Sequence, residues 1–186
     1  MTEPGSEHAL LAAAADGDAT AFDALVRRHT VRLYRVALRI VGDPVEAEDV
    51  VQEAWVQAWR GLAGFRGSAA VSTWLYRVVT NAALGHLRRR RPAVPVDPTE
   101  PGGPAAQWVD PRSGPEAIAL RNERAAAVHR AIATLEPSQR VPLVLHELEG
   151  LSYAEVAEVL QVSVPALQSR LSRARVTLLA RLEELR

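Results

Sequence analysis

The sequence contains no cysteine among its 186 residues, so disulfides, thiolate metal sites and thiol chemistry of its own are excluded. Aromatic residues make up only 5% of the chain, so its hydrophobic cores must consist mainly of Ala, Val and Leu. No apolar run reaches the about 18 residues of a membrane-spanning helix. The first residues, MTEPGSEHAL, lack the basic start and long apolar run of a signal peptide. We therefore expect a cytoplasmic protein without direct membrane insertion.

Lysine is also absent, and all 22 basic residues are arginines that balance 22 acidic residues. The two signs are segregated along the chain. Residues 1–26 and 42–56 carry acids and no base, whereas residues 27–41 and 57–91 carry arginines and no acid. Such blocks are typical of surfaces for charged partners, although solvated faces can also have this pattern.

Residues 92–115 hold seven of the twelve prolines, and five of these recur at every third position. Proline lacks an amide hydrogen and fixes φ, so this segment is not expected to form a helix or a central strand. We expect an extended, flexible linker that could reach roughly 70 Å. It divides the chain into two small domains, residues 1–91 and 116–186.

The apolar residues in both flanks recur at three- and four-residue spacing, without the alternation of strands. The sequence therefore predicts an all-α fold of two small helical domains. The expected helices span about 18–41, 43–60, 72–90, 115–135, 137–148, 152–160 and 164–185.

The C-terminal domain contains the pattern of a helix-turn-helix. Ser152 and Glu155 form a capping box before a short helix, and Gln161 and Val162 make a tight turn. Ser163 can then cap a second helix. Two short helices joined by such a turn, the second rich in Arg and Ser, are typical of duplex DNA readers.

A helical wheel sorts the second of these helices into two faces. The stripe expected to be buried comprises Leu167, Leu171, Ala174 and Leu178, and Arg170 and Arg175 flank it. The opposite face comprises Gln168, Ser169, Ser172 and Arg173. Small polar side chains with one long cation suit a major groove, because Arg and Gln can pair with base edges. The alternative is an ordinary amphipathic helix with a basic exposed face.

Two helices of the N-terminal domain have opposite characters. Trp74, Arg77, Asn81 and Arg88 share one acid-free helical face, which suits unstacked bases and phosphates, although Trp74 could also be partly buried packing. The preceding segment FRGSAA could wrap a single base. The helix before it carries four acids, Glu46, Glu48, Asp49 and Glu53. Gln52 on the same helix adds an amide to this set. These acids either complement the helix dipole or form a docking face for a basic protein.

Three segments, in this order, resemble the extracytoplasmic-function (ECF, group IV) sigma factors of bacterial RNA polymerase. They are EAEDVVQEAWVQAWR, FRGSAAVSTWLYRVVTNAALGHLRRR and LEPSQRVPLVLHELEGLSYAEVAEVLQVSVPALQSRLSRAR. The resemblance covers nearly the whole chain and includes a linker of the family's kind.

The resemblance implies that residues 1–91 form sigma region 2, which docks on core polymerase and opens the minus-ten element. The residues implied to face the clamp of the beta-prime subunit are Glu48, Asp49, Gln52 and Glu53. Those implied to capture a flipped base are Gly67, Ser68, Ala69 and Ala70, and those implied to support the opened strand are Trp74, Arg77 and Asn81.

The C-terminal domain resembles region 4, which reads the minus-thirty-five element. The implied reading residues, Gln168, Ser169, Ser172 and Arg173, are those that the wheel placed outward. Backbone contacts are expected from Arg170, Arg175 and Arg88. The implied partners are core RNA polymerase, including its beta flap, promoter DNA and an anti-sigma factor.

Two other classes of protein remain open. A stand-alone helix-turn-helix regulator would account for the C-terminal half but not for the acidic or the tryptophan-bearing helix. A helical interaction protein would use the basic faces for an acidic partner. The five scattered histidines show no metal-ligand spacing, and no catalytic motif is present, so the sequence predicts neither an enzyme nor a cofactor.

Overall fold

The structure is a computed structural model that describes residues 4–65, 70–90 and 127–184. Within these ranges all regular structure is helical, which confirms the predicted fold class. We refer to the described residues up to 90 as the N-terminal module and to residues 127–184 as the C-terminal module. Residues 92–115, the predicted linker, lie outside the described residues, and the predicted domain boundaries stay a prediction.

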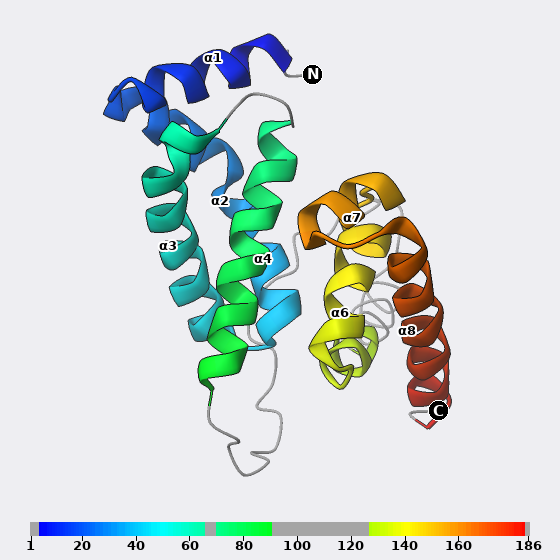
Figure 1. Ribbon diagram of the computed structural model, residues 1–186. Coiled ribbons are helices and arrows are strands. Elements are labelled where there is room, and N and C mark those ends of the chain that lie inside the picture. Colours follow the sequence, from blue (N-terminus) through cyan, green and yellow to red (C-terminus); the bar gives the residue numbers. More distant parts are fainter. Residues whose placement is uncertain (1–3, 66–69, 91–126, 185–186) are drawn as a thin grey trace, which may run out of the picture.

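Four α-helices form the N-terminal module, in blue to green in Figure 1: α1 (Pro4–Ala15), α2 (Ala19–Val41), α3 (Pro44–Gly61) and α4 (Val71–Arg89). A 3₁₀ turn, η1 (Leu62–Gly64), follows α3. The Asp18 carboxylate accepts hydrogen bonds from the backbone amides of Thr20 and Ala21 at 2.8 and 3.2 Å. Asp43 caps α3 in the same way, so both predicted helix starts are confirmed.

Helix α1 was not predicted from the sequence. Its segment PGSEHALLAAAA is dominated by alanine and shows no amphipathic period, so a pattern search has little to detect. Its packing is specific all the same, because Leu11 and Ala14 are buried where α1 crosses α2. The contact with α2 therefore decides which side of this alanine-rich helix is buried.

The C-terminal module comprises residues 127–133, α6 (Pro137–Leu143), η2 (Val144–Leu148), α7 (Tyr153–Leu160) and α8 (Val164–Glu184). The predicted capping box is present, and Gln161 turns the chain with a φ of 53°. The single helix predicted for residues 137–148 is wrong in its last five residues, because η2 is a π turn. Pro142 lacks the amide hydrogen for an α-helical bond, which loosens the helix just before this turn.

The two modules lie side by side in Figure 1, and their buried residues form one continuous cluster. Helix α4 contacts α7, and α2 contacts both η2 and α6. The sequence predicted two separate domains on a long linker, with no indication of a contact between them. This contact places the C-terminal module against α2 and α4.

Candidate nucleic-acid and partner interfaces

The exposed face of α8 has the arrangement predicted for a DNA-reading helix. Leu167, Leu171 and Ala174 are fully buried against the rest of the C-terminal module. The side chains on the opposite face, all exposed, are Gln168, Ser169, Ser172 and Arg173. The predicted faces are therefore confirmed except at Leu178, which is only partly buried, and α8 exposes small polar groups with one guanidinium.

The two arginines at the edges of this face have different surroundings. Arg170 is partly buried, whereas Arg175 is exposed. Arg175 donates to a Glu147 carboxylate oxygen at 2.7 and 2.9 Å and contacts the Tyr153 hydroxyl at 3.4 Å. Hydrogen bonds to Tyr153 and Glu147 raise the pKa of Arg175 above its ordinary value. A phosphate at Arg175 would therefore compete with Glu147.

The predicted open face of α4 is only partly open. Asn81 and Arg88 are exposed and Arg77 is partly buried, but Trp74 is only 8% exposed. The burial of Trp74 therefore favours the alternative left open for it, packing inside the module, over direct contact with unstacked bases. Phe65 directly follows η1, and its ring packs edge-on against Trp74 with 5.5 Å between the ring centroids. A helical wheel of α4 alone cannot predict this burial, because Phe65 lies outside the helix.

The predicted base-capturing loop precedes α4. Gly67, Ser68 and Ala69 lie outside the described residues. Ala70 is exposed and extended, and it stands at the N-cap position of α4. Of the four loop residues, only Ala70 is described, at the point where the chain enters α4. The base-capturing function of the loop stays a prediction.

The acidic face of α3 is largely available to a partner. Glu48, Asp49 and Gln52 are exposed. Glu53 is partly buried, because its carboxylate accepts hydrogen bonds from the Arg89 guanidinium at 2.7 Å and the Gln57 amide at 3.0 Å. Glu53 therefore links α3 to the end of α4, while the other three side chains face solvent.

Apolar side chains that were not singled out from the sequence extend this face. Val45, Val56 and Trp59 are 69%, 48% and 44% exposed. Together with Asp49 and Gln52 they follow a four-three-four-three spacing, which places all five on one stripe of the helix. We call these five residues the α3 stripe. An exposed stripe with apolar ends and an acidic, polar centre is typical of a protein-docking surface. The spacing alone could have revealed it.

No group of His, Cys, Asp and Glu in the described ranges is arranged to hold a metal ion. No helix there is both long and apolar enough to cross a membrane. His29 is buried beside Glu7, and burial is the main reason that its pKa lies below the ordinary value.

Comparison with known proteins connects these faces to a family. Residues 25–93 match the Sigma-70 region 2 family, and residues 125–178 match the Sigma-70 region 4 family. The RNA polymerase sigma-H factor of Pseudomonas aeruginosa is 42% identical, over 86% of this chain and 84% of that protein. The ECF RNA polymerase sigma factor SigM of Mycobacterium tuberculosis is 40% identical, over 93% and 83%. The ECF RNA polymerase sigma-E factor of Escherichia coli is 36% identical, over 94% and 93%.

Solved structures share this fold. CnrH, solved in complex with the cytosolic domain of CnrY, superimposes with a TM-score of 0.69 at 30% identity, over 96% of this chain and 98% of that one. The sigma factor RpoE of Bartonella quintana, solved with the anti-sigma factor NepR, shares the fold with a TM-score of 0.62 at 21% identity, over 87% and 96%. The two region matches and the relatives at up to 42% identity over most of the chain show that it belongs to the ECF sigma factors of bacterial RNA polymerase.

Proposed function

We propose that this chain binds core RNA polymerase in the cytoplasm, recognises promoter DNA and directs the initiation of transcription of a specific regulon. The observation that carries the proposal is the surface of α8, where Gln168, Ser169, Ser172 and Arg173 are exposed while the leucines beneath them are buried. Sigma factors are initiation factors rather than enzymes, and we assign no reaction to this chain.

The minus-thirty-five element is the proposed target of α8. A helix with this face fits the major groove, where Arg pairs with guanine and Gln with adenine, and Ser bonds to either bases or phosphate. Arg170 lies at the edge of the same face and would contact the DNA backbone. Arg175 would do so in exchange for its bonds to Glu147.

The minus-ten element is the proposed target of the loop before α4 and of α4 itself. Residues Gly67 to Ala70 would hold a flipped base, and Arg77, Asn81 and Arg88 would support the opened strand or its phosphates. Because Trp74 packs against Phe65, its proposed part is to fix the start of α4 and thereby the end of the loop.

Core polymerase is the proposed partner of the α3 stripe and of Glu48, which would meet the clamp of the beta-prime subunit, while the C-terminal module meets the beta flap. Glu53 would contribute through its bond to Arg89. An anti-sigma factor that covers these surfaces is the proposed regulator, in line with the family. The solved RpoE relative is described in complex with such a factor.

A run-off transcription assay tests this function. The purified chain is mixed with core polymerase on genomic promoter fragments, and complex formation with core is followed in parallel by gel filtration. We expect promoter-specific transcripts that neither component gives alone. A stand-alone helix-turn-helix regulator would bind duplex DNA without forming a complex with core, and that result would overturn the proposal.

A further inference from the structure

The charge of Arg175 on α8 is balanced inside the C-terminal module. Arg175 lies seven residues after Gln168 and three after Ser172, so it continues their stripe along the helix. Its guanidinium donates to one carboxylate oxygen of Glu147, from Nε at 2.9 Å and from Nη2 at 2.7 Å. Nη2 also lies 3.4 Å from the Tyr153 hydroxyl oxygen. A cation beside the face proposed to bind DNA therefore already has an anionic partner.

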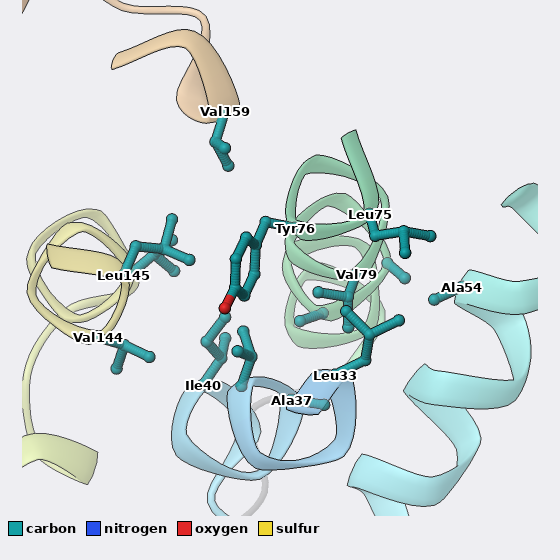
Figure 2. Close-up of a cluster of buried hydrophobic side chains, with 14 of the residues drawn as sticks. Leu33, Ala37, Ile40, Ala54, Leu75, Tyr76, Val79, Val144, Leu145 and Val159 are labelled. Carbon is teal, nitrogen blue, oxygen red and sulfur yellow. The ribbon is translucent and has the colours of Figure 1, made fainter. Parts of the chain in front are cut away.

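The anionic partner belongs to η2, the π turn that precedes the helix-turn-helix. Two earlier residues of this turn, Val144 and Leu145, have no exposed surface, and Figure 2 shows both among the buried side chains. Glu147, two residues after Leu145, is exposed. Helical π turns are rare and occur frequently at functional sites. The buried part of η2 therefore anchors the backbone that carries the Glu147 carboxylate.

The second partner of Arg175 is held by the neighbouring residue of the same turn. The His146 ring stacks on the Tyr153 ring, with 4.4 Å between the centroids and 30° between the planes. Nδ1 of His146 lies 2.7 Å from the Leu151 carbonyl oxygen, which fixes the orientation of the imidazole. Two successive residues of η2 thus place both acceptors of Arg175, the Glu147 carboxylate directly and the Tyr153 hydroxyl through the stacked ring.

A DNA phosphate that approaches Arg175 also meets the charge of Glu147. The side chains of the pair are 47% and 41% exposed, so water and salt weaken the pair and a phosphate can replace the carboxylate. The exchange gives up the bonds to Glu147 and leaves its carboxylate near a phosphate of the same sign. The affinity gained from Arg175 is therefore smaller than that from Arg173, which contacts a neutral acceptor, the Ser169 carbonyl, at 3.4 Å.

We propose that Glu147 is an intramolecular competitor for Arg175, which weakens the binding of this chain to DNA of any sequence. A phosphate contact contributes affinity but carries no sequence information, so Glu147 reduces that part of the affinity and leaves base reading by α8 unchanged. Because a genome offers a great excess of nonspecific sites, weaker nonspecific binding keeps the chain available for core polymerase and promoters. This inference rests on the proposed function. Glu147 is a positioning residue, since it acts through Arg175.

The variant Glu147→Gln tests the competitor, because it removes the charge and keeps the shape of the side chain. Fluorescence anisotropy measures binding of the full-length chain to a labelled duplex of scrambled sequence. We expect Glu147→Gln to bind this duplex about two- to fivefold more tightly than the wild type, the range that a weak exposed ion pair implies. The matched control is Glu158→Gln, which removes an exposed acid of α7 in the same module and should gain less.

The salt dependence of binding is a second measurement, and a merely structural role of Glu147 would not change it in this way. In the wild type, the carboxylate beside Arg175 lowers the net charge that meets the phosphates, so fewer counterions leave the DNA. The slope of log affinity against log salt should therefore steepen by up to about 0.9 in Glu147→Gln, equivalent to one further phosphate contact. A damaged η2 turn would instead lower the affinity for DNA.

Substitution of Arg175 separates competition from a general effect of charge. Arg175→Gln alone should weaken binding to the scrambled duplex, because it leaves the Glu147 charge without its cation. Glu147→Gln added to Arg175→Gln should recover no more affinity than Glu158→Gln does, because no guanidinium remains to be released. An equal gain from Glu147→Gln with and without Arg175 would overturn the inference, and so would wild-type affinity in Glu147→Gln alone.

A second duplex, taken from a promoter that gives a run-off transcript and carrying its upstream element, distinguishes this inference from the proposed function. We expect Glu147→Gln to gain affinity for this duplex and for the scrambled duplex by the same factor, so that their ratio stays as in the wild type. A changed ratio would overturn the sequence-independent role. If the wild-type chain gives no promoter-specific transcript with core polymerase, the proposed function fails, whereas the scrambled duplex still decides whether Glu147 competes for Arg175.

Discussion

Helices α8 and α4 were both predicted to carry polar faces suited to DNA, and only α8 exposes all the residues of its predicted face to solvent. On α8, every side chain expected to point outward is exposed; of the stripe expected inward, Leu167, Leu171 and Ala174 are buried and Leu178 is only partly buried. On α4, Asn81 and Arg88 are exposed, but Trp74 is buried beneath Phe65. Helix α8 packs against its module along one side, whereas α4 is covered by α2, α3, α7 and the Phe65 ring. A wheel predicts exposure well only where one side of a helix is covered.

The largest effect should come from removing Trp74. We expect Trp74→Ala to lower the free energy of unfolding by about 3–5 kcal/mol, because it empties a packed aromatic site. The control Asn81→Ala, at an exposed position of the same helix, should change it by about 0.5 kcal/mol or less. Urea unfolding followed by circular dichroism measures both. Equal small effects would mean that Trp74 is exposed in solution and free to contact bases.

A substitution at Arg173 tests whether the exposed face of α8 reads bases. We expect Arg173→Ala to weaken binding to the upstream promoter element by about 1–3 kcal/mol if the guanidinium pairs with a base, and to relax the preference at that position. Arg170→Ala, at the edge of the face, should weaken all sequences alike because a phosphate contact carries no sequence information. Competition binding with base-substituted promoter fragments checks this. Unchanged selectivity in Arg173→Ala would remove it from the reading set.

The α3 stripe tests whether exposure alone identifies a contact. We expect Asp49→Arg to weaken core polymerase binding roughly tenfold, equivalent to about 1.4 kcal/mol, by placing a cation where an acid would meet the clamp. Glu183→Arg at the far end of α8 makes the same charge change at another exposed acid. Fluorescence anisotropy against core, with helicity verified by circular dichroism, provides the comparison. Equal affinities for the two variants would disprove clamp docking by this stripe.

The smallest effect concerns the cap of α7, the first helix of the helix-turn-helix. We expect Ser152→Ala to cost about 1 kcal/mol of stability at pH 7, because the Ser152 hydroxyl accepts from the Glu155 amide. Hydrogen bonds from Ser152, first from its side chain and then from its backbone, lower the pKa of Glu155.

The sign of the pH dependence follows from this lowered pKa. Glu155 contributes stability above its unfolded pKa, and the contribution is lost as pH falls through the lower folded value. Part of the difference between wild type and Ser152→Ala should therefore disappear in strong acid. Thermal unfolding at pH 7 and pH 3 measures this change, and a constant difference would contradict the capping box.

Much of the fold follows from local signals. The caps at Asp18, Asp43 and Ser152 act on amides two or three residues away, so the sequence alone predicts where those helices begin. The two faces of α8 follow from 3.6-residue periodicity in the same way. The exposure of the polar residues proposed to read DNA was therefore predictable from the sequence.

What the sequence by itself determined was the all-helical class, three capped helix starts, the helix-turn-helix and the outward set on α8. Only the tertiary structure decided the burial of Trp74, the helical packing of residues 4–15, and the contact between the two modules through Glu149 and Arg140. The physical reason is range. Caps and periodicity depend on atoms within one or two turns, whereas Glu149 and Arg39 are 110 residues apart in the chain and meet only because two separate modules pack together.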